Sequence, residues 1–244
     1  MSPEKSNTIT QLKKELLTIG GYKFANQQVL YPSGLAFMNA HFPNSCFPKG
    51  AIHEFLCGGA EATAATMGFI AAMISSNFNA IDSIIYVGTR HFVYPLALTQ
   101  YGLEPWQLVF VQPNHKKAGL WAIEEALKCE GLTVVIAELE ALSFVESRRF
   151  QLAVEGSGVT GLLLNLNPKA KSTTASIARW QIGCKNSKAI NALPGVGHQQ
   201  WLVNLQKIRH GKPGQWAVEW DGSVLAQVDL TIPILHDLQL KNAI

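Results

Sequence analysis

The chain has 244 residues, of which 48% are hydrophobic and 15% are charged, and it carries a formal net charge of +3. This size and composition allow a sizeable buried core, and the mild charge permits but does not require contact with nucleic acid. No apolar run is long enough to span a bilayer and no N-terminal signal segment is visible. The sequence therefore predicts a cytoplasmic protein that does not contact membranes.

The distribution of cysteine and histidine argues against a metal centre. The 4 cysteines, Cys46, Cys57, Cys129 and Cys184, include no C-x-x-C pair, and the 7 histidines are dispersed along the chain. Zinc sites need such residues at characteristic short spacings. We therefore expect the cysteines to be buried and unpaired, and we expect neither a metal nor another cofactor.

The N-terminal segment, residues 1–46, is predicted to contain one helix and a linker. Within Thr8–Thr18, apolar residues recur at helical spacing, with lysines and a glutamate between them. The stretch from Gly20 to Gly50 is rich in Gly, Pro and Asn, which favours irregular chain. This arm could cap its own core or bind a partner.

Between Ala51 and Asn167, apolar strands alternate with amphipathic helices. The predicted strands are Ile52–Leu56, Ser83–Gly88, Leu108–Val111, Thr133–Ala137 and Thr160–Leu166. The predicted helices are Ala62–Ser76, Tyr94–Tyr101, Ala118–Cys129 and Phe144–Gly156. This alternation indicates an α/β fold with a mostly parallel sheet flanked by helices.

From Ser176 onward the pattern changes to short strands separated by turns. The expected strands are Ile177–Ile182, Gln200–Ile208, Gln215–Trp220 and Ser223–Leu230. We expect residues 176–230 to extend the parallel sheet as antiparallel strands. Residues 47–230 then form one domain with its core at 51–167, and residues 231–244 form a tail that is either poorly ordered or a docking peptide.

The segment Ile52–Gly68 has the strand–loop–helix context of a phosphate-binding P-loop, but it contains no lysine. An active P-loop places a lysine on the β- and γ-phosphates and a hydroxyl on Mg²⁺. Gly58 and Gly59 could retain a weak anion-binding turn at the helix N-terminus, or they could form a tight turn without a ligand. The sequence thus favours an ATPase core that has lost its chemistry.

The stretch Ile84–Pro113 resembles RecA recombinases. It has a strand, a His-containing turn, a Pro-initiated helix, a Gly and a second strand ending in Gln-Pro. The resemblance implies a RecA-like core and locates the catalytic positions of that family. The phosphate-binding lysine, the glutamate that orients the attacking water and the metal-associated aspartate fall on Thr63, Arg90 and Ala137, respectively.

The residues at these positions do not support hydrolysis. Thr63 cannot neutralise a phosphate, Arg90 has no acceptor with which to orient water, and Ala137 gives Mg²⁺ nothing to bind. Glu138, one residue further on, or Glu140 could still replace the aspartate after a shift of one residue. The resemblance therefore implies a degenerate nucleotide site and no ATPase activity.

Over most of the chain, motifs resemble the ImuA family, the RecA-like and SulA-like proteins of bacterial DNA-damage mutagenesis cassettes. The motifs are FPKGAIHEF (Phe47–Phe55), LWAIEEALK (Leu120–Lys128), ESRRFQLAVEGSGVTGLLL (Glu146–Leu164), SIARWQI (Ser176–Ile182) and IRHGKPGQWAVEW (Ile208–Trp220). The resemblance implies a role in translesion synthesis during the SOS response. It also implies three partners: an ImuB-type polymerase-like protein, RecA and an error-prone DnaE-type polymerase.

Several basic and aromatic residues are candidates for contacts with these partners or, weakly, with DNA. They are Arg148 and Arg149 at a helix start, Lys169 and Lys171 in a polar loop, Arg179 in a strand, and Arg209, Lys212 and Trp216 in a hairpin-like turn. Each also has a structural interpretation, as a solvated helix face or loop, a partner of an internal carboxylate, or a tryptophan packed in the core. We prefer the turn around Trp216 as the interaction element.

Three functions remain open at this point. The preferred one is a non-catalytic RecA-like adaptor that binds protein partners in an SOS mutagenesis assembly. The kinship with SulA implies instead an inhibitor of cell division that binds FtsZ. The third is an atypical DNA-dependent ATPase with an unconventional P-loop.

Overall fold

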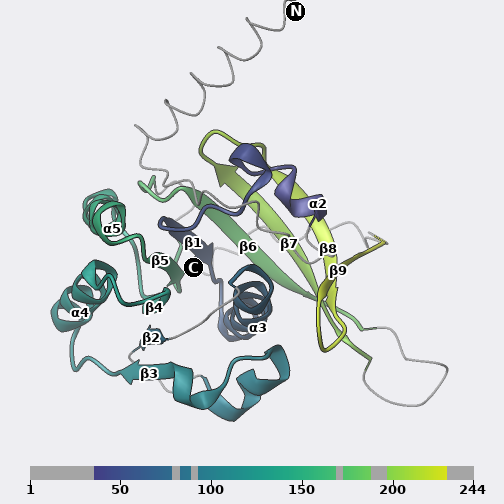
Figure 1. Cartoon of the computed structure of the whole chain (residues 1–244), viewed down its shortest axis with the longest axis horizontal. Coiled ribbons are helices and arrows are strands. Elements are labelled where there is room, and N and C mark those ends of the chain that lie inside the picture. Colours follow the sequence, from purple (N-terminus) through teal and green to yellow (C-terminus); the bar gives the residue numbers. More distant parts are fainter. Residues whose placement is uncertain (1–35, 79–82, 89–92, 169–172, 188–196, 230–244) are drawn as a thin grey trace, which may run out of the picture.

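The structure is a computed structural model that describes residues 36–78, 83–88, 93–168, 173–187 and 197–229. These residues form one sheet of nine strands in the order β3-β2-β4-β5-β1-β6-β7-β8-β9 (Figure 1). The strands are β1 (Ile52–Leu56), β2 (Ile84–Val87), β3 (Leu108–Val111), β4 (Val134–Leu139), β5 (Thr160–Asn165), β6 (Ala178–Lys185), β7 (Gln199–Ile208), β8 (Gly214–Trp220) and β9 (Leu225–Val228). The helices are α2 (Ala36–Asn39), α3 (Ala60–Asn77), α4 (Lys116–Lys128) and α5 (Phe144–Ser157), with short 3-10 helices η2 (Pro43–Ser45), η3 (Pro95–Tyr101) and η4 (Pro105–Gln107).

The sheet joins a parallel half to an antiparallel half, as the sequence predicted, except that β6, expected among the antiparallel strands, is parallel to β1. Strands β3, β2, β4, β5, β1 and β6 are parallel neighbours. From β6 the sheet continues through β7, β8 and β9 as antiparallel neighbours. Strand β1 lies at the centre of the nine-stranded sheet, between β5 and β6. The loop after it opens at the carboxyl edge of the parallel strands, where open α/β sheets bind ligands.

Helices cover both faces of the parallel half. Helix α3 packs on one face, whereas α4 and α5 lie next to each other on the other face (Figure 1). Strand residues alternate between the two layers, so that Ile136 of β4 joins the core under α3 and Val135 joins the core under α4 and α5. None of the helices in the described ranges is long and apolar enough to cross a membrane.

Two predicted elements differ in the structure. The segment Pro95–Tyr101 forms a 3-10 helix instead of an α-helix. The last strand starts at Leu225 and not at Ser223, because the Asp221 side chain holds the preceding residues in a turn. Its Oδ1 accepts hydrogen bonds from the backbone N–H groups of Ser223 and Val224 at 2.8 and 2.9 Å.

The cysteines are less buried than expected. Cys57 is buried and Cys46 is half-buried, whereas Cys129 and Cys184 are exposed. Cys129 is the C-cap of α4 and Cys184 lies near the end of β6. Both thiols are exposed because they lie at the ends of these elements.

Trp180 of β6 is the centre of the core beneath α3. Its side chain is fully buried, and its ring stacks on Phe55 of β1 with a centroid distance of 5.9 Å. The indole N–H of Trp180 donates to Nδ1 of buried His53 at 3.3 Å, and the His53 Nε2–H donates to the Pro48 carbonyl at 2.7 Å. These two bonds require the neutral Nε2–H tautomer of His53.

The buried state of His53 should make the fold less stable in mild acid. Burial lowers the pKa of His53 to about 4, because the imidazolium would lose its hydration. In the unfolded chain the pKa of histidine is about 6.5, so the unfolded state binds the proton first as the pH falls. The free energy of unfolding should therefore decrease between pH of about 6.5 and about 4, by up to about 3 kcal/mol.

Urea unfolding at a series of pH values measures this dependence. The matched control is His53→Gln, which lacks the titrating group, whereas the carboxylates titrate in both proteins. The stability difference between wild type and His53→Gln should shrink or reverse as the pH falls. Parallel profiles for the two proteins would show that His53 is not held neutral.

Candidate functional site

The turn between β1 and α3 occupies the position of a phosphate cradle. Strand β1 ends at Leu56, the Cys57 N–H donates to the Asn165 carbonyl at 2.9 Å, and α3 begins after its N-cap Gly59. Gly59 has φ of 125° and ψ of 177°, a conformation that is essentially restricted to glycine. The N-terminus of α3 therefore opens at the carboxyl edge of the sheet, where a bound phosphate would lie.

The electrostatics of this turn differ from those of a working P-loop. Thr63, at the predicted lysine position, is only 7% exposed, and its hydroxyl donates to the Gly59 carbonyl at 2.8 Å. The sequence from Cys57 to Asn77 contains no Lys or Arg, and Glu61 adds a carboxylate to the first helical turn. A phosphate would meet backbone N–H groups and the helix dipole but no cation from α3, so the attraction is weak.

The strained geometry of Gly59 predicts a large effect of a small substitution. Gly59→Ala should destabilise the fold by about 1–3 kcal/mol, because alanine is strained at this positive φ. Nothing lies within 4 Å of a Cβ built on either Gly58 or Gly59, so crowding does not contribute.

Gly58→Ala is the matched control, because Gly58 has no positive φ. It should change stability by less than about 0.5 kcal/mol. Thermal unfolding of the two variants gives the comparison, and equal melting temperatures would contradict the backbone geometry at Gly59.

The carboxylate of this site lies one residue beyond its predicted position. The alignment placed the aspartate on Ala137, but Ala137 belongs to the core under α4 and α5. Glu138 points to the opposite face, where the hydroxyl of Tyr86, a member of the core under α3, donates to its Oε1 at 2.5 Å. Because side chains alternate along a strand, only Glu138 of this pair can face the turn before α3. Of the two glutamates considered for this position, Glu138 lies on the face of β4 that carries α3, while Glu140 is exposed beyond the end of β4.

The groups around Glu138 are protonated at neutral pH. Burial and the hydrogen bond to Glu138 raise the pKa of Tyr86, so its phenol stays a donor. Burial raises the pKa of Cys57 to about 11, although hydrogen bonds with Thr66 and Thr63 oppose the rise. A protonated, buried thiol is a poor nucleophile, so this cluster offers packing and one paired carboxylate.

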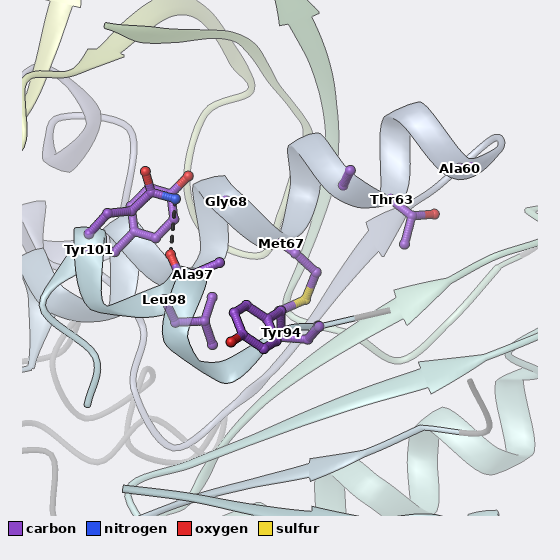
Figure 2. Close-up of a pocket in the computed structure, with 11 residues that line it drawn as sticks. Ala60, Thr63, Met67, Gly68, Tyr94, Ala97, Leu98 and Tyr101 are labelled. Carbon is purple, nitrogen blue, oxygen red and sulfur yellow. Dashed lines mark hydrogen bonds between the residues drawn. The ribbon is translucent and has the colours of Figure 1, made fainter. Parts of the chain in front are cut away.

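A cavity of about 210 Å³ lies beside the turn, between α3 and η3 (Figure 2). Its walls include Thr63 and Met67 of α3 and Leu98 and Tyr101 of η3. Figure 2 shows the ring of Tyr94 next to the Met67 side chain. None of the described residues that line the cavity is charged, so it suits a small uncharged group and offers no countercharge to a phosphate.

Three residues predicted for the site, Arg90, Lys169 and Lys171, lie outside the described residues. Their roles stay predictions.

Arg148 and Arg149 lie on α5 and are both exposed. Glu146, in the first turn of the same helix, forms a capping box with Ser143: the Ser143 N–H donates to Glu146 at 2.9 Å, and the Glu146 N–H donates to Ser143 Oγ at 3.2 Å. Arg149 pairs with Glu124 of α4. Within the described ranges, Arg148 forms no ion pair.

Arg179 is bound inside the protein. Its Nε donates to Oε2 of Glu54 at 3.0 Å, and Glu54 is fully buried. Glu54 also accepts hydrogen bonds from Asn165 Nδ2 at 2.9 Å and from Thr174 Oγ1 at 2.6 Å. Of the two predicted partners of Arg179, the internal carboxylate is therefore confirmed.

The turn before Trp216 is held by the segment that precedes β1. Trp216 is 5% exposed, and the ring of His41 meets it edge-on at a centroid distance of 4.8 Å. The Lys212 N–H donates to the His41 carbonyl at 2.9 Å, and Arg209 donates to the Ala175 carbonyl at 3.2 Å. The preference for Trp216 as a contact residue is thus corrected, because the side chain packs in the core. Lys212 is exposed.

Sequence reasoning missed the outer surface of α4 and α5. Trp121 of α4 and Phe144, Val145 and Leu152 of α5 are exposed by 66%, 56%, 68% and 51%. Large apolar residues on the polar side of a predicted amphipathic helix are the signal that could have revealed it.

The sheet and the turn after β1 define a RecA-like fold, in which the segment from Cys57 to Asn77 contains no lysine. The crystal structure of the RadB recombinase is similar to this chain, with a TM-score of 0.51 and 11% identity over 74% of this chain and 92% of that chain. No family model matches the chain. Protein ImuA of two strains of Caulobacter vibrioides is 28% identical over 190 residues, which cover 73% of this chain and 78% of the relative. This similarity supports the resemblance to the ImuA family that the motifs predicted.

Proposed function

We propose that this protein is a non-catalytic adaptor in error-prone translesion DNA synthesis during the SOS response. The relationship to Protein ImuA and the RecA-like fold support a role in a mutagenesis cassette. In this proposal the adaptor binds an ImuB-type polymerase-like protein and RecA in the cytoplasm, and it works beside an error-prone DnaE-type polymerase.

The observation that carries the proposal is the state of the turn before α3. Phosphoryl transfer depends on positioning and on neutralising the developing negative charge. Here Thr63 is turned back onto the Gly59 carbonyl, and Glu61 adds negative charge to the same helical turn. Glu138 remains as a carboxylate, but it is buried and bound by Tyr86. A site of this kind supports binding through surfaces better than it supports hydrolysis.

ATP turnover tests the non-catalytic part. Purified protein with Mg-ATP should release no more phosphate than buffer, with or without single-stranded DNA. Glu138→Gln is the informative variant, because Glu138 is the one carboxylate that faces the turn from β4. Turnover by the wild type that is abolished in Glu138→Gln would overturn the proposal and restore the atypical ATPase.

Complex formation tests the adaptor part. On a sizing column the protein should elute with the ImuB-type protein, with RecA or with both. FtsZ is the control partner, and its polymer yield should not change when the protein is added. Elution with neither partner, or a loss of FtsZ polymer, would reject the adaptor, and the second result would favour the SulA-type inhibitor.

A further inference from the structure

We propose that the groove between α4 and α5 binds an acidic amphipathic helix of a partner protein. This inference rests on the adaptor function proposed above and names the surface and the chemistry of one partner. The two helices lie next to each other on the face of the sheet opposite α3 (Figure 1).

The groove between α4 and α5 is lined by charged residues and by small residues. Its volume is about 470 Å³, and its walls include Glu124 and Lys128 of α4 and Arg149 of α5. Ala153 and Gly156 also line it, and nothing lies within 4 Å of a Cβ built on Gly156. Small residues at this point leave room for a large apolar side chain or for close approach of a helix.

Exposed apolar side chains border the groove along both helices. On α4, Trp121 lies at i, i+3 and i+7 spacing with Glu124 and Lys128, which line the groove, so it shares their face. On α5, Val145 shares a face in the same way with Leu152, which lines the groove. Trp121, Val145 and Leu152 are 66%, 68% and 51% exposed, as expected of a surface that another protein covers.

The cations near the N-terminal ends of α4 and α5 favour acidic residues on the part of the occupant that lies there. Arg148 lies one turn from both Val145 and Leu152, is exposed, and forms no ion pair with any described residue. Lys116 and Lys117 are exposed in the first turn of α4. Both helices follow strands of the parallel sheet, so their positive N-terminal ends lie at the same end of the groove. Acidic residues on the docking helix would face this end.

A protein helix fits this surface better than nucleic acid does. A phosphate backbone is charged along its whole length and would meet Glu124 and Glu130 of the groove, whereas a protein helix can carry its acidic residues only where they face Arg148. Val145 and Leu152, the apolar side chains next to Arg148, are aliphatic, so among the apolar residues that border the groove only Trp121 offers an aromatic face on which a base could stack. Apolar anchors next to one unpaired cation are typical of helix-in-groove recognition.

The test uses the full chain and labelled, overlapping peptides of about 20 residues from the ImuB-type protein and from RecA, long enough to form a helix. We expect an acidic amphipathic peptide to bind, and Arg148→Glu and Leu152→Arg each to weaken it by about 10-fold or more. Replacing the matching acidic residue of the peptide by lysine should restore binding to Arg148→Glu. Leu96→Ala, a substitution of an exposed apolar residue on η3, is the matched control and should not change the affinity.

The outcomes separate this proposal from the adaptor function. If the wild type binds an intact partner and the groove variants bind it equally well, only the groove assignment fails. If the wild type binds neither intact partner, the adaptor function itself fails. If Arg148→Glu weakens binding of single-stranded DNA and leaves protein binding unchanged, the surface is a nucleic-acid site and the proposal is overturned. Far-UV circular dichroism and the unfolding midpoint confirm that each variant is folded.

Discussion

Replacing Arg179 by methionine should lower the free energy of unfolding by about 3–5 kcal/mol. Glu54 is fully buried, and the Arg179 guanidinium is its ion-pair partner at 3.0 Å. Methionine keeps much of the length of the side chain but leaves a buried carboxylate whose charge is not compensated. Urea unfolding of wild type and Arg179→Met at neutral pH measures the loss.

Two further variants identify the cause. The double variant Glu54→Leu/Arg179→Met removes both charges and should recover part of the stability, because a buried ion pair can often be replaced by apolar residues at little cost. The recovery should be incomplete, because the Asn165 and Thr174 side chains lose their acceptor. Lys128→Met breaks an exposed pair with Glu124 and Glu125 and should have little effect. A double variant less stable than Arg179→Met would show that the carboxylate is needed for another reason.

Replacing Trp180 by alanine should cost a similar amount, about 3–5 kcal/mol. Trp180 is the largest of the fully buried side chains, and its ring contacts the rings of Phe55, Phe42 and Phe69. Alanine would leave a cavity that these neighbours, which belong to different segments, cannot easily close. The measurement is the shift in the denaturant midpoint at constant slope.

Trp180→Phe is the matched control for this prediction. It keeps an aromatic ring but removes the N–H that donates to His53, so it should cost clearly less than alanine. If Phe and Ala were equally destabilising, the indole hydrogen bond rather than the packed volume would be the main contribution of Trp180.

Both predictions concern the junction between the two halves of the sheet. Glu54 belongs to β1 and Arg179 and Trp180 to β6, and these strands are neighbours. If a variant of Arg179 lost partner binding, the cause would therefore be a less stable fold and not the loss of a direct contact with the partner. Exposed residues such as Arg148 are the better probes of contact.

Much of the fold could be predicted because it depends on local pattern. Strand Leu108–Val111 was predicted with its observed bounds, since an apolar run between a proline-containing turn and Gln-Pro leaves little freedom. An internal carboxylate was one of the two partners expected for Arg179, and the structure has Glu54 in this role. The antiparallel strands followed from the turns between them.

The parts that could not be predicted depend on contacts between distant segments. Whether Trp216 is buried is decided by His41, which lies far away in the sequence. The choice between Ala137 and Glu138 required knowledge of which face of β4 carries α3. The groove between α4 and α5 arises from two helices whose exposed apolar residues look incidental when each helix is considered alone.

The central claim is that the protein acts through partner binding and not through nucleotide hydrolysis. The most direct test is to measure complex formation with the ImuB-type protein and with RecA in nucleotide-free buffer, in ADP and in Mg-ATP. We predict the same affinity under all three conditions, because the turn before α3 provides no side-chain cation for a phosphate. A complex that forms only with Mg-ATP, or that dissociates as ATP is consumed, would contradict the claim.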